Sequence, residues 1–351
     1  MNDLRVLIRT PNHVGDCVMS LAALARLRAR SPNCHITLVA PAYVAELYEA
    51  TRVADDIVAL RSYHGVAGAR ALYSAVRARG SFEIAMTFTD SLGAVAALRS
   101  VGVRRVFGYG ANGRSLLLTR ALDTSARKNR HRALSYCDLC DSALESSERA
   151  TIESLRLPGL TFSDADRSSI SEIAQERGLR STTSWVALAP QAVAPSRRWG
   201  FANYGRLCQR IVAELGLEVG LIGSTNEAPA AVEVIRLSGC KTGVTNFCGA
   251  FGLRDSLILL SSVGVFVGND SGSAHLAALA GASLVVLSGP DNPLETSPLS
   301  DDKSIIYRRE LPCISCVRNR CPLTGPSHML CMRSISVEEV FETLRFRLRP
   351  S

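Results

Sequence analysis

Long apolar runs are missing from this 351-residue chain. No uninterrupted stretch approaches the roughly 18 residues needed to cross a bilayer, and residues 5–9 are charged at both ends and follow no apolar signal-peptide core. Aromatic residues make up only 6% of the sequence, and no helix-turn-helix, zinc-finger or RNA-binding pattern is present. We therefore expect a protein that stays in the cytoplasm and does not bind nucleic acid.

Two nucleotide-binding fingerprints are also missing. The first predicted strand, residues 5–9, is not followed by a G-x-G-x-x-G turn, and no G-x-x-x-x-G-K-[ST] loop occurs. These absences argue against NAD-linked redox chemistry and against P-loop chemistry. The eleven cysteines are odd in number and spread over both halves, which indicates a reducing compartment rather than a disulfide framework.

Strand-like and helix-like segments alternate along the chain, which predicts an α/β fold with parallel sheets. The length suits two Rossmann-like domains, 1–178 and 179–335, separated where the polar run 177–184 interrupts the periodicity, with a C-terminal helix in 336–351 that returns across the junction. The predicted strands are 5–9, 35–39, 57–60, 84–88, 105–107, 185–189, 218–222, 264–267 and 283–287. The first predicted helix ends near residue 30. The other predicted helices span 67–79, 91–100, 131–145, 163–177, 202–214, 227–237, 254–261, 274–280 and 337–348.

The polar turn at 269–273 joins a buried strand to a helix built of small residues. Such a turn gathers backbone N–H groups and the positive end of a helix dipole at the carboxyl edge of a sheet, where anions bind. Ser271 and Gly272 suit a phosphate, and His275 lies one helical turn further on. The alternative is that Asp270 or Ser271 is only an N-cap and His275 an ordinary half-buried histidine.

Other predicted strand ends in the second half are similarly small and polar. Gln191 follows one strand, and Arg197 and Arg198 come shortly after it; guanidinium groups bind phosphate oxygens in pairs. Ser224 and the loop 288–291 follow two further strands. The second domain is therefore predicted to hold a diphosphate.

In the first domain, a Gly15-Asp16 pair follows the first strand and precedes a helix. This placement puts a carboxylate at the mouth between the domains, where it can act as a general base, the alternative being a helix cap. Residues 99–132 contain nine basic side chains and one acidic one, which indicates either an anionic partner or a solvated loop.

Four motifs occur in one order along the chain: Pro-Asn-x-x-Gly-Asp at 11–16, Pro-Ser-Arg-Arg-Trp at 195–199, Asn-Asp-Ser-Gly-x-x-His at 269–275 and Gly-Pro at 289–290. Together they resemble the ADP-heptose:lipopolysaccharide heptosyltransferases of glycosyltransferase family 9, and the first is most similar to the heptosyltransferase II members. The resemblance implies a GT-B architecture, with two Rossmann-like domains facing a central cleft. It also implies an inverting transfer of heptose from ADP-L-glycero-D-manno-heptose to the heptosyl-Kdo2-lipid A inner core, with no required metal or other cofactor.

Carried over by position, the resemblance makes Asp16 the general base and assigns Asn12 and His13 to the acceptor. Gln191, Arg197, Arg198, Ser224, Asp270, Ser271, Gly272 and His275 are assigned to the donor. The sequence departs from the family pattern at three positions: Arg197 replaces the commoner Lys, Ser271 replaces Thr, and His13 stands where heptosyltransferase II members usually have Trp. The first two changes keep a cation and a hydroxyl; the third alters the acceptor side.

Cys313, Cys316, Cys321 and Cys331 lie within 19 residues, and four thiolates can surround a zinc ion. The spacing matches a paired Cys-x-x-Cys site only in part, which favours a reduced, packed loop without metal.

The expected partners are ADP-heptose, the lipid A-core acceptor and the anionic inner face of the inner membrane, at which the protein is peripheral. The alternatives are a family 9 heptosyltransferase with a different acceptor, a GT-B nucleotide-sugar epimerase, and a nucleotide-sugar-binding protein without activity.

Overall fold

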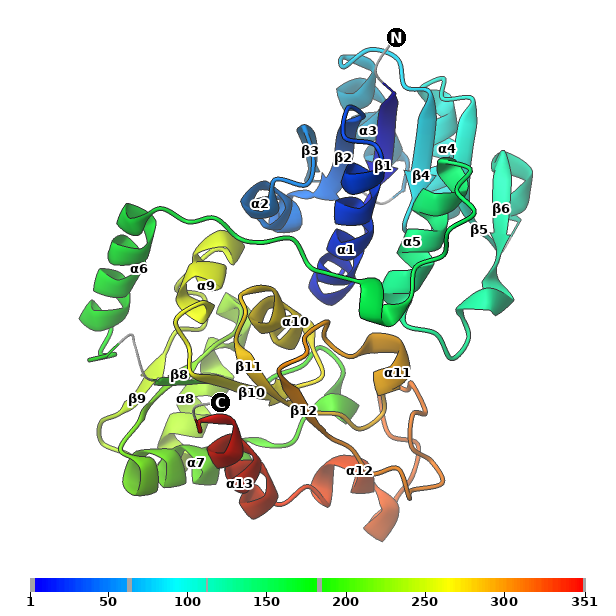
Figure 1. Cartoon of the computed structure of the whole chain (residues 1–351). Helices are drawn as coiled ribbons and strands as arrows, with labels where there is room; N and C mark the ends of the chain where they lie inside the picture. Colours follow the sequence, from blue (N-terminus) through cyan, green and yellow to red (C-terminus); the bar gives the residue numbers. More distant parts are fainter. Residues whose placement is uncertain (1–3, 62–64, 112, 182–184, 350–351) are drawn as a thin grey trace. The chain divides into compact units, whose positions relative to one another are not determined.

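The computed structural model divides the chain into two compact units, Met1–Thr161 and Phe162–Ser351 (Figure 1). It describes residues 4–61, 65–111, 113–181 and 185–349. None of the described helices is long and apolar enough to cross a bilayer.

The first unit is built on a six-stranded parallel sheet in the order β3-β2-β1-β4-β5-β6. Helices α1, α2 and α5 and helices α3 and α4 form two packed groups beside it (Figure 1). The strands are β1 (Arg5–Arg9), β2 (His35–Pro41), β3 (Asp56–Leu60), β4 (Ile84–Thr87), β5 (Arg105–Gly110) and β6 (Arg120–Asp123). The helices are α1 (Val14–Arg30), α2 (Ala42–Thr51), α3 (Gly65–Arg77), α4 (Leu92–Ser100) and α5 (Arg132–Ala143), with short 3₁₀ turns at Arg114–Leu117, Thr124–Arg127 and Ile152–Ser154.

The second unit repeats this design with the order β12-β11-β10-β7-β8-β9. Its strands are β7 (Trp185–Ala189), β8 (Glu218–Leu221), β9 (Val244–Asn246), β10 (Val265–Asn269), β11 (Ser283–Leu287) and β12 (Lys303–Ile306). Its helices are α6 (Asp164–Glu176), α7 (Phe201–Arg210), α8 (Ala228–Ser238), α9 (Leu253–Leu260), α10 (Gly272–Leu279), α11 (Pro293–Thr296), α12 (Leu330–Arg333) and α13 (Val337–Arg347). A π-helical turn, Ile211–Leu215, extends α7, and 3₁₀ turns lie at Pro195–Arg197, Thr225–Glu227 and Gly325–Ser327.

Read from their third strands, both sheets have the same order, 3-2-1-4-5-6. The order reverses between β1 and β4 in the first unit and between β7 and β10 in the second. In open parallel sheets, ligands bind outside the carboxyl ends of the strands at this point of reversal. The predicted pair of Rossmann-like parallel sheets is therefore confirmed, and each unit has one position where a site is expected.

The central strands were predictable because they are buried on both faces and read as continuous apolar runs, as in β11. The edge strands β6, β9 and β12 were not predicted. They are short and carry partly exposed polar side chains, so their sequences show no apolar periodicity. Helix α2 was also missed, although Leu47 and Tyr48 are fully buried.

The units divide 17 residues before the predicted boundary at 178, because α6 belongs to the second unit, where Asp166 pairs with Arg254 at the start of α9 (2.9 Å). The predicted linker 177–184 ends in residues 182–184, which lie outside the described part of the chain.

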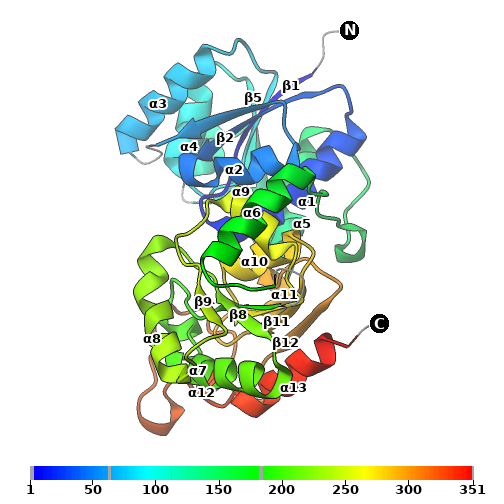
Figure 2. The ribbon, with the colours of Figure 1, turned by 90° about the vertical axis from the view of Figure 1, so that its left-hand side faces the viewer.

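Helix α13 also packs inside the second unit, against α7 and the face of the sheet that α7 covers (Figure 2). Its Val340, Phe341 and Leu344 are fully buried in that core, and the Arg210 guanidinium of α7 lies 3.8 Å from the centre of the Phe341 ring. The apolar face of α13 is thus covered within the second unit, rather than across the junction as the sequence suggested.

Candidate functional site

Asp16 lies in the first turn of α1, directly after the carboxyl end of β1. His13 occupies the N-cap position, so Asp16 is not the helix cap that the alternative interpretation required. Instead, Arg132 Nη1 at the start of α5 donates to Asp16 Oδ1 (2.9 Å). Asp16 therefore sits at the point of strand reversal with one oxygen fixed by an arginine 116 residues away.

The loop that carries Asp16 is held by Arg9, which is almost fully buried. Arg9 Nη1 donates to the Thr10 carbonyl and Nη2 donates to Asn12 Oδ1, both at 2.6 Å. The hydroxyl of Tyr43 in α2 donates to the Asn12 carbonyl. Asn12 is thus a structural element of the loop, whereas the exposed His13 side chain makes no capping hydrogen bond. Their assignment to the acceptor stays a prediction.

An aromatic pair lies near Asp16. The rings of Phe88 and Tyr136 are 4.9 Å apart, and both side chains are buried. Burial raises the pKa of Tyr136 well above its ordinary value, and the nearby Asp16 carboxylate raises it further. The carboxylate therefore borders a region from which water is excluded, where electrostatic interactions are stronger than in bulk solvent.

In the second unit, Asn269 joins the two strands that flank the point of reversal. It ends β10, two residues beyond the predicted strand end, and is fully buried. Its Oδ1 accepts a hydrogen bond from Trp199 N (3.1 Å), and its Nδ2 donates to the Pro190 carbonyl (3.1 Å). Asn269 thereby fixes the loop after β7 next to the turn that begins α10, a role the sequence analysis did not assign.

Two polar atoms at this edge have no hydrogen-bond partner among the described residues, although neither is accessible to solvent: Gln191 Oε1 after β7 and Ser271 Oγ at the N-cap of α10. Ser271 occupies the N-cap position but its hydroxyl caps nothing, so the cap interpretation does not explain the residue. Gly272 is the first residue of the helix. Buried polar atoms are normally satisfied, and an unsatisfied pair at a helix N-terminus indicates a ligand position.

Asp270, next to Ser271, belongs to a buried acidic pair. Ser288 Oγ donates to Asp270 Oδ2 (3.2 Å), and Asp291, which is also buried, lies close by. Burial, followed by repulsion from Asp291, raises the pKa of Asp270 from 3.8 to about 7, against the opposing effect of the Arg197 charge. Asp270 therefore titrates near neutral pH.

Arg197 is bound by Asp291 through two contacts, Nη2 to Oδ1 (2.7 Å) and Nε to Oδ2 (2.6 Å). This fork leaves other guanidinium N–H groups for a ligand, because arginine has five donors. Arg198 is used differently: its Nε donates to the Ala192 carbonyl (2.9 Å) and shapes the loop after β7. The sequence had singled out the loop of Asp291 but not its contact with Arg197.

The remaining predicted donor residues differ in their surroundings. His275 is buried on α10, not half-buried as its alternative interpretation held. Ser224 caps a 3₁₀ turn, with both its backbone N–H and its hydroxyl donating to Glu227 Oε2 (2.7 and 3.0 Å). The structure thus gives Ser224 a capping role, and its contact with the donor stays a prediction.

The charge of segment 99–132 is compensated in part by four acids from outside it. Five of its arginines form ion pairs with such acids: Arg105 with Glu145, Arg114 and Arg127 with Asp90, Arg130 with Asp138, and Arg132 with Asp16. These acids lie outside the segment, which is why a count within it overstated the surplus.

In the cysteine loop, Cys313 and Cys316 are exposed and Cys321 and Cys331 are partly buried, all with free thiols. Burial and the three neighbouring thiols raise the pKa of Cys331. Across the described residues, no three His, Cys, Asp or Glu side chains are grouped so as to hold a metal ion. The metal-free loop stays a prediction, which metal analysis of the purified protein tests.

Two Rossmann-like units, each built on a parallel sheet in the order 3-2-1-4-5-6, make up the GT-B fold of sugar transferases. The family model for glycosyltransferase family 9 (heptosyltransferase) matches residues 69–326, and the chain belongs to this family.

Relatives and solved structures agree with this assignment. The chain is 27% identical over 318 residues to lipopolysaccharide heptosyltransferase 2 of Escherichia coli K12, covering 86% of this chain and 88% of that protein. The solved structure of the E. coli ADP-heptose lipopolysaccharide heptosyltransferase II matches with a TM-score of 0.80 at 24% identity, over 98% of both chains. A family 9 glycosyltransferase from Veillonella parvula matches with a TM-score of 0.82 at 18% identity, over 99% of this chain and 98% of that one.

Proposed function

We propose that the protein transfers heptose from ADP-L-glycero-D-manno-heptose to a hydroxyl of the lipopolysaccharide inner core, with heptosyl-Kdo2-lipid A as acceptor. The observation that carries the proposal is the Asp16 carboxylate, held by Arg132 at the strand reversal of a family 9 chain. The names of the relatives, which are heptosyltransferases of the second type, support the choice of sugar and acceptor.

In this reaction Asp16 is the general base. The acceptor oxygen attacks the anomeric carbon of the heptose while the bond from that carbon to the diphosphate oxygen breaks, and Asp16 takes the proton of the acceptor hydroxyl. Attack opposite the leaving group inverts the anomeric centre. Arg132 contributes by orienting the carboxylate, since a base must be aligned with the proton it removes.

The turn at 270–272 and Arg197 act on the leaving group. Negative charge builds up on the diphosphate as the sugar bond breaks, and backbone N–H groups at the start of α10 together with a guanidinium stabilise it. Ser271 Oγ and Gln191 Oε1, both without partners among the described side chains, are proposed to contact the donor. No step requires a metal ion.

We also propose that the protein works at the inner face of the inner membrane. Arg120 and Lys128 of segment 99–132 are exposed and pair with no acid among the described residues, so they are available to an anionic surface. Sedimentation with vesicles containing an anionic phospholipid tests this point, and equal sedimentation with neutral vesicles would contradict it.

Incubating the protein with ADP-heptose and a panel of truncated lipid A cores, followed by mass measurement, tests the reaction. One heptose added to a core that already carries one heptose is the expected product. Addition only to a different core would support another family 9 acceptor. Consumption of ADP-heptose without any acceptor would support an epimerase, and binding without turnover would support an inactive binding protein.

A further inference from the structure

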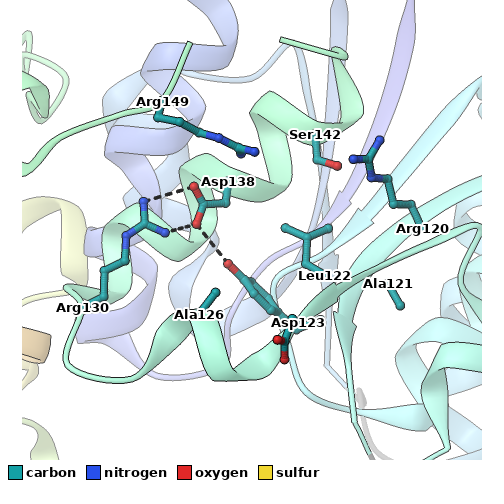
Figure 3. A pocket seen from close by; sticks show the side chains of 10 residues that line it. Arg120, Ala121, Leu122, Asp123, Ala126, Arg130, Asp138, Ser142 and Arg149 are labelled. Carbon is teal, nitrogen blue, oxygen red and sulfur yellow. Dashed lines mark hydrogen bonds and ion pairs between the residues drawn. The ribbon is translucent and has the colours of Figure 1, made fainter. Parts of the chain in front are cut away.

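A cavity of about 450 Å³ opens in the first unit, away from the loop that carries Asp16. It lies between the edge strand β6, the following 3₁₀ turn, helix α5 and Arg149 (Figure 3). A second hollow of about 310 Å³ adjoins it, and the two share Arg120, Ser142 and Arg149 in their linings. These three residues therefore stand where the two hollows meet, and the polar ends of Arg149, Ser142 and Arg120 are directed into this space (Figure 3).

The acids of the lining already have partners. Asp138 accepts from Nη1 and Nη2 of Arg130, as the dashed lines in Figure 3 show, and from the hydroxyl of Tyr109 (3.4 Å). Glu145 pairs with Arg105 (2.6 Å), and Asp123 accepts from the backbone N–H and the hydroxyl of Ser125. The negative charges of the lining are thus neutralised or hydrogen-bonded without Arg120 and Arg149.

Arg120 and Arg149 have no acid or hydrogen-bond acceptor within the part of the chain that the structure describes. Between them lies the hydroxyl of Ser142, a residue that is only 9% exposed and whose Oγ is buried with no partner among the described residues. A buried hydroxyl normally finds a partner, so this one indicates a polar group that is supplied from outside the chain. Two arginines and one hydroxyl donor together match the three oxygens of a phosphoryl group.

We propose that Arg120, Ser142 and Arg149 form a binding subsite for a phosphoryl group of the acceptor saccharide. The proposal rests on the proposed function for the identity of the saccharide, but the phosphoryl chemistry is argued from the cavity alone. A cavity of this size is in the range that accommodates a sugar-sized ligand.

The distance along α5 between the subsite and Arg132 indicates which part of the acceptor the subsite binds. Arg132, which holds Asp16, begins this helix, and Ser142 lies ten residues further on, about 15 Å along the axis at 1.5 Å per residue. A phosphoryl group bound there belongs to a part of the acceptor remote from the reacting hydroxyl. Such a contact strengthens binding of the acceptor and discriminates between acceptors with and without the charge, while leaving the chemical step largely unchanged.

Direct binding to the full-length protein is the first arm of the test. Calorimetric titration with a hexose 6-phosphate, with the unphosphorylated hexose and with inorganic phosphate is compared in wild type, Arg149→Gln, Ser142→Ala and Arg104→Gln. The phosphorylated sugar is expected to bind wild type and Arg104→Gln equally, and about tenfold more weakly to the two cavity variants, each of which loses one hydrogen bond to a charged group. Arg104 is the matched control because it is an exposed arginine of the same unit outside both hollows.

Equal binding of the phosphorylated sugar by all four proteins would overturn the site. Binding of inorganic phosphate as tight as that of the phosphorylated sugar would assign the site to free phosphate and overturn the saccharide part. Because Arg120 and Arg149 are exposed, Arg149→Gln and Arg120→Gln keep the test valid if Ser142→Ala fails to fold.

Acceptor kinetics are the second arm. With a phosphorylated lipid A core, Arg149→Gln is expected to raise the acceptor KM about tenfold with little change in kcat or in the donor KM, and with an enzymatically dephosphorylated core it is expected to behave like wild type. An equal rise of the acceptor KM with the phosphorylated and the dephosphorylated core would overturn the proposal. If no core is a substrate, the proposed function fails, while the binding arm still decides whether the cavity takes a phosphoryl group.

Discussion

Arg132 and Asp16, the first residue of one helix and a residue in the first turn of another, are joined by a 2.9 Å contact between Nη1 and Oδ1. Helices α1 and α5 pack along each other, so this contact fixes the carboxylate of the proposed base to the framework of the first unit. The residue that positions the proposed base is thus supplied by a segment that looks, in sequence, like part of a basic loop.

Replacing Arg132 by Gln is therefore expected to lower kcat by up to about a hundredfold, because the carboxylate loses its orientation but not its identity. Steady-state kinetics with donor and acceptor varied separately measure the effect. Arg104→Gln, which removes an exposed charge from the same segment, is the control and should be near wild type. An unchanged kcat in Arg132→Gln would show that the contact has no role in transfer.

Arg197→Gln is expected to weaken donor binding by roughly ten- to a hundredfold, since it removes a charge-assisted hydrogen bond to the diphosphate. Asp291→Asn should have a smaller effect, because Arg197 keeps its charge and loses only the carboxylate that orients it. Titration with ADP compares the variants. A larger loss in Asp291→Asn than in Arg197→Gln would reverse the roles of the two residues.

Asp270 makes stability depend on pH in an unusual direction. Its pKa is raised from 3.8 to about 7, so between these values the folded protein holds a proton that the unfolded chain has released. The stability contributed by this protonation is present at low pH and is lost as pH rises through about 4 to about 7. Unfolding in urea at pH 5 and pH 8 should show that the free energy of unfolding of Asp270→Asn, relative to that of wild type, is higher at pH 8 than at pH 5. The same difference in free energy of unfolding between the two proteins at both pH values would contradict the raised pKa.

Asp141 gives a test of the first unit's framework. It is fully buried on α5 and accepts from Arg26 (3.1 Å) and Arg30 (3.2 Å) of α1. Asp141→Asn is expected to cost about 3 kcal/mol of the free energy of unfolding, because two poorly exposed arginines lose a buried carboxylate and keep only the exposed Glu148. Glu145→Gln, which breaks an exposed pair with Arg105, should change little. Equal denaturant midpoints for both variants would contradict this account.

Much of the fold could be predicted because its central strands are buried on both faces, and β1, β7 and β11 have the predicted bounds. The predicted strand end before Gly268 was wrong, because β10 continues through it to Asn269; a Cβ at this position would lie 2.7 Å from the ring of Phe266, so glycine here makes room for that ring. The edge strands β6, β9 and β12 carried no such pattern.

The positions of Asp16, Asp270 and Ser271 could also be predicted, because all three lie between the end of a strand and the first turn of the next helix. Their partners could not. Arg132 is 116 residues from Asp16 and Asp291 is 94 residues from Arg197, and no local pattern relates residues at such distances. The sequence therefore located the candidate site, and only the structure gave the residues that orient it.

The central claim is that Asp16 removes the proton of the acceptor, and Asp16→Asn tests it most directly because amide and carboxylate have nearly the same shape. Turnover with ADP-heptose and the heptosyl lipid A core, measured beside the Kd for ADP, should fall by at least about a hundredfold while the Kd stays within about twofold of wild type. Near-normal turnover in Asp16→Asn would contradict the assignment of the base.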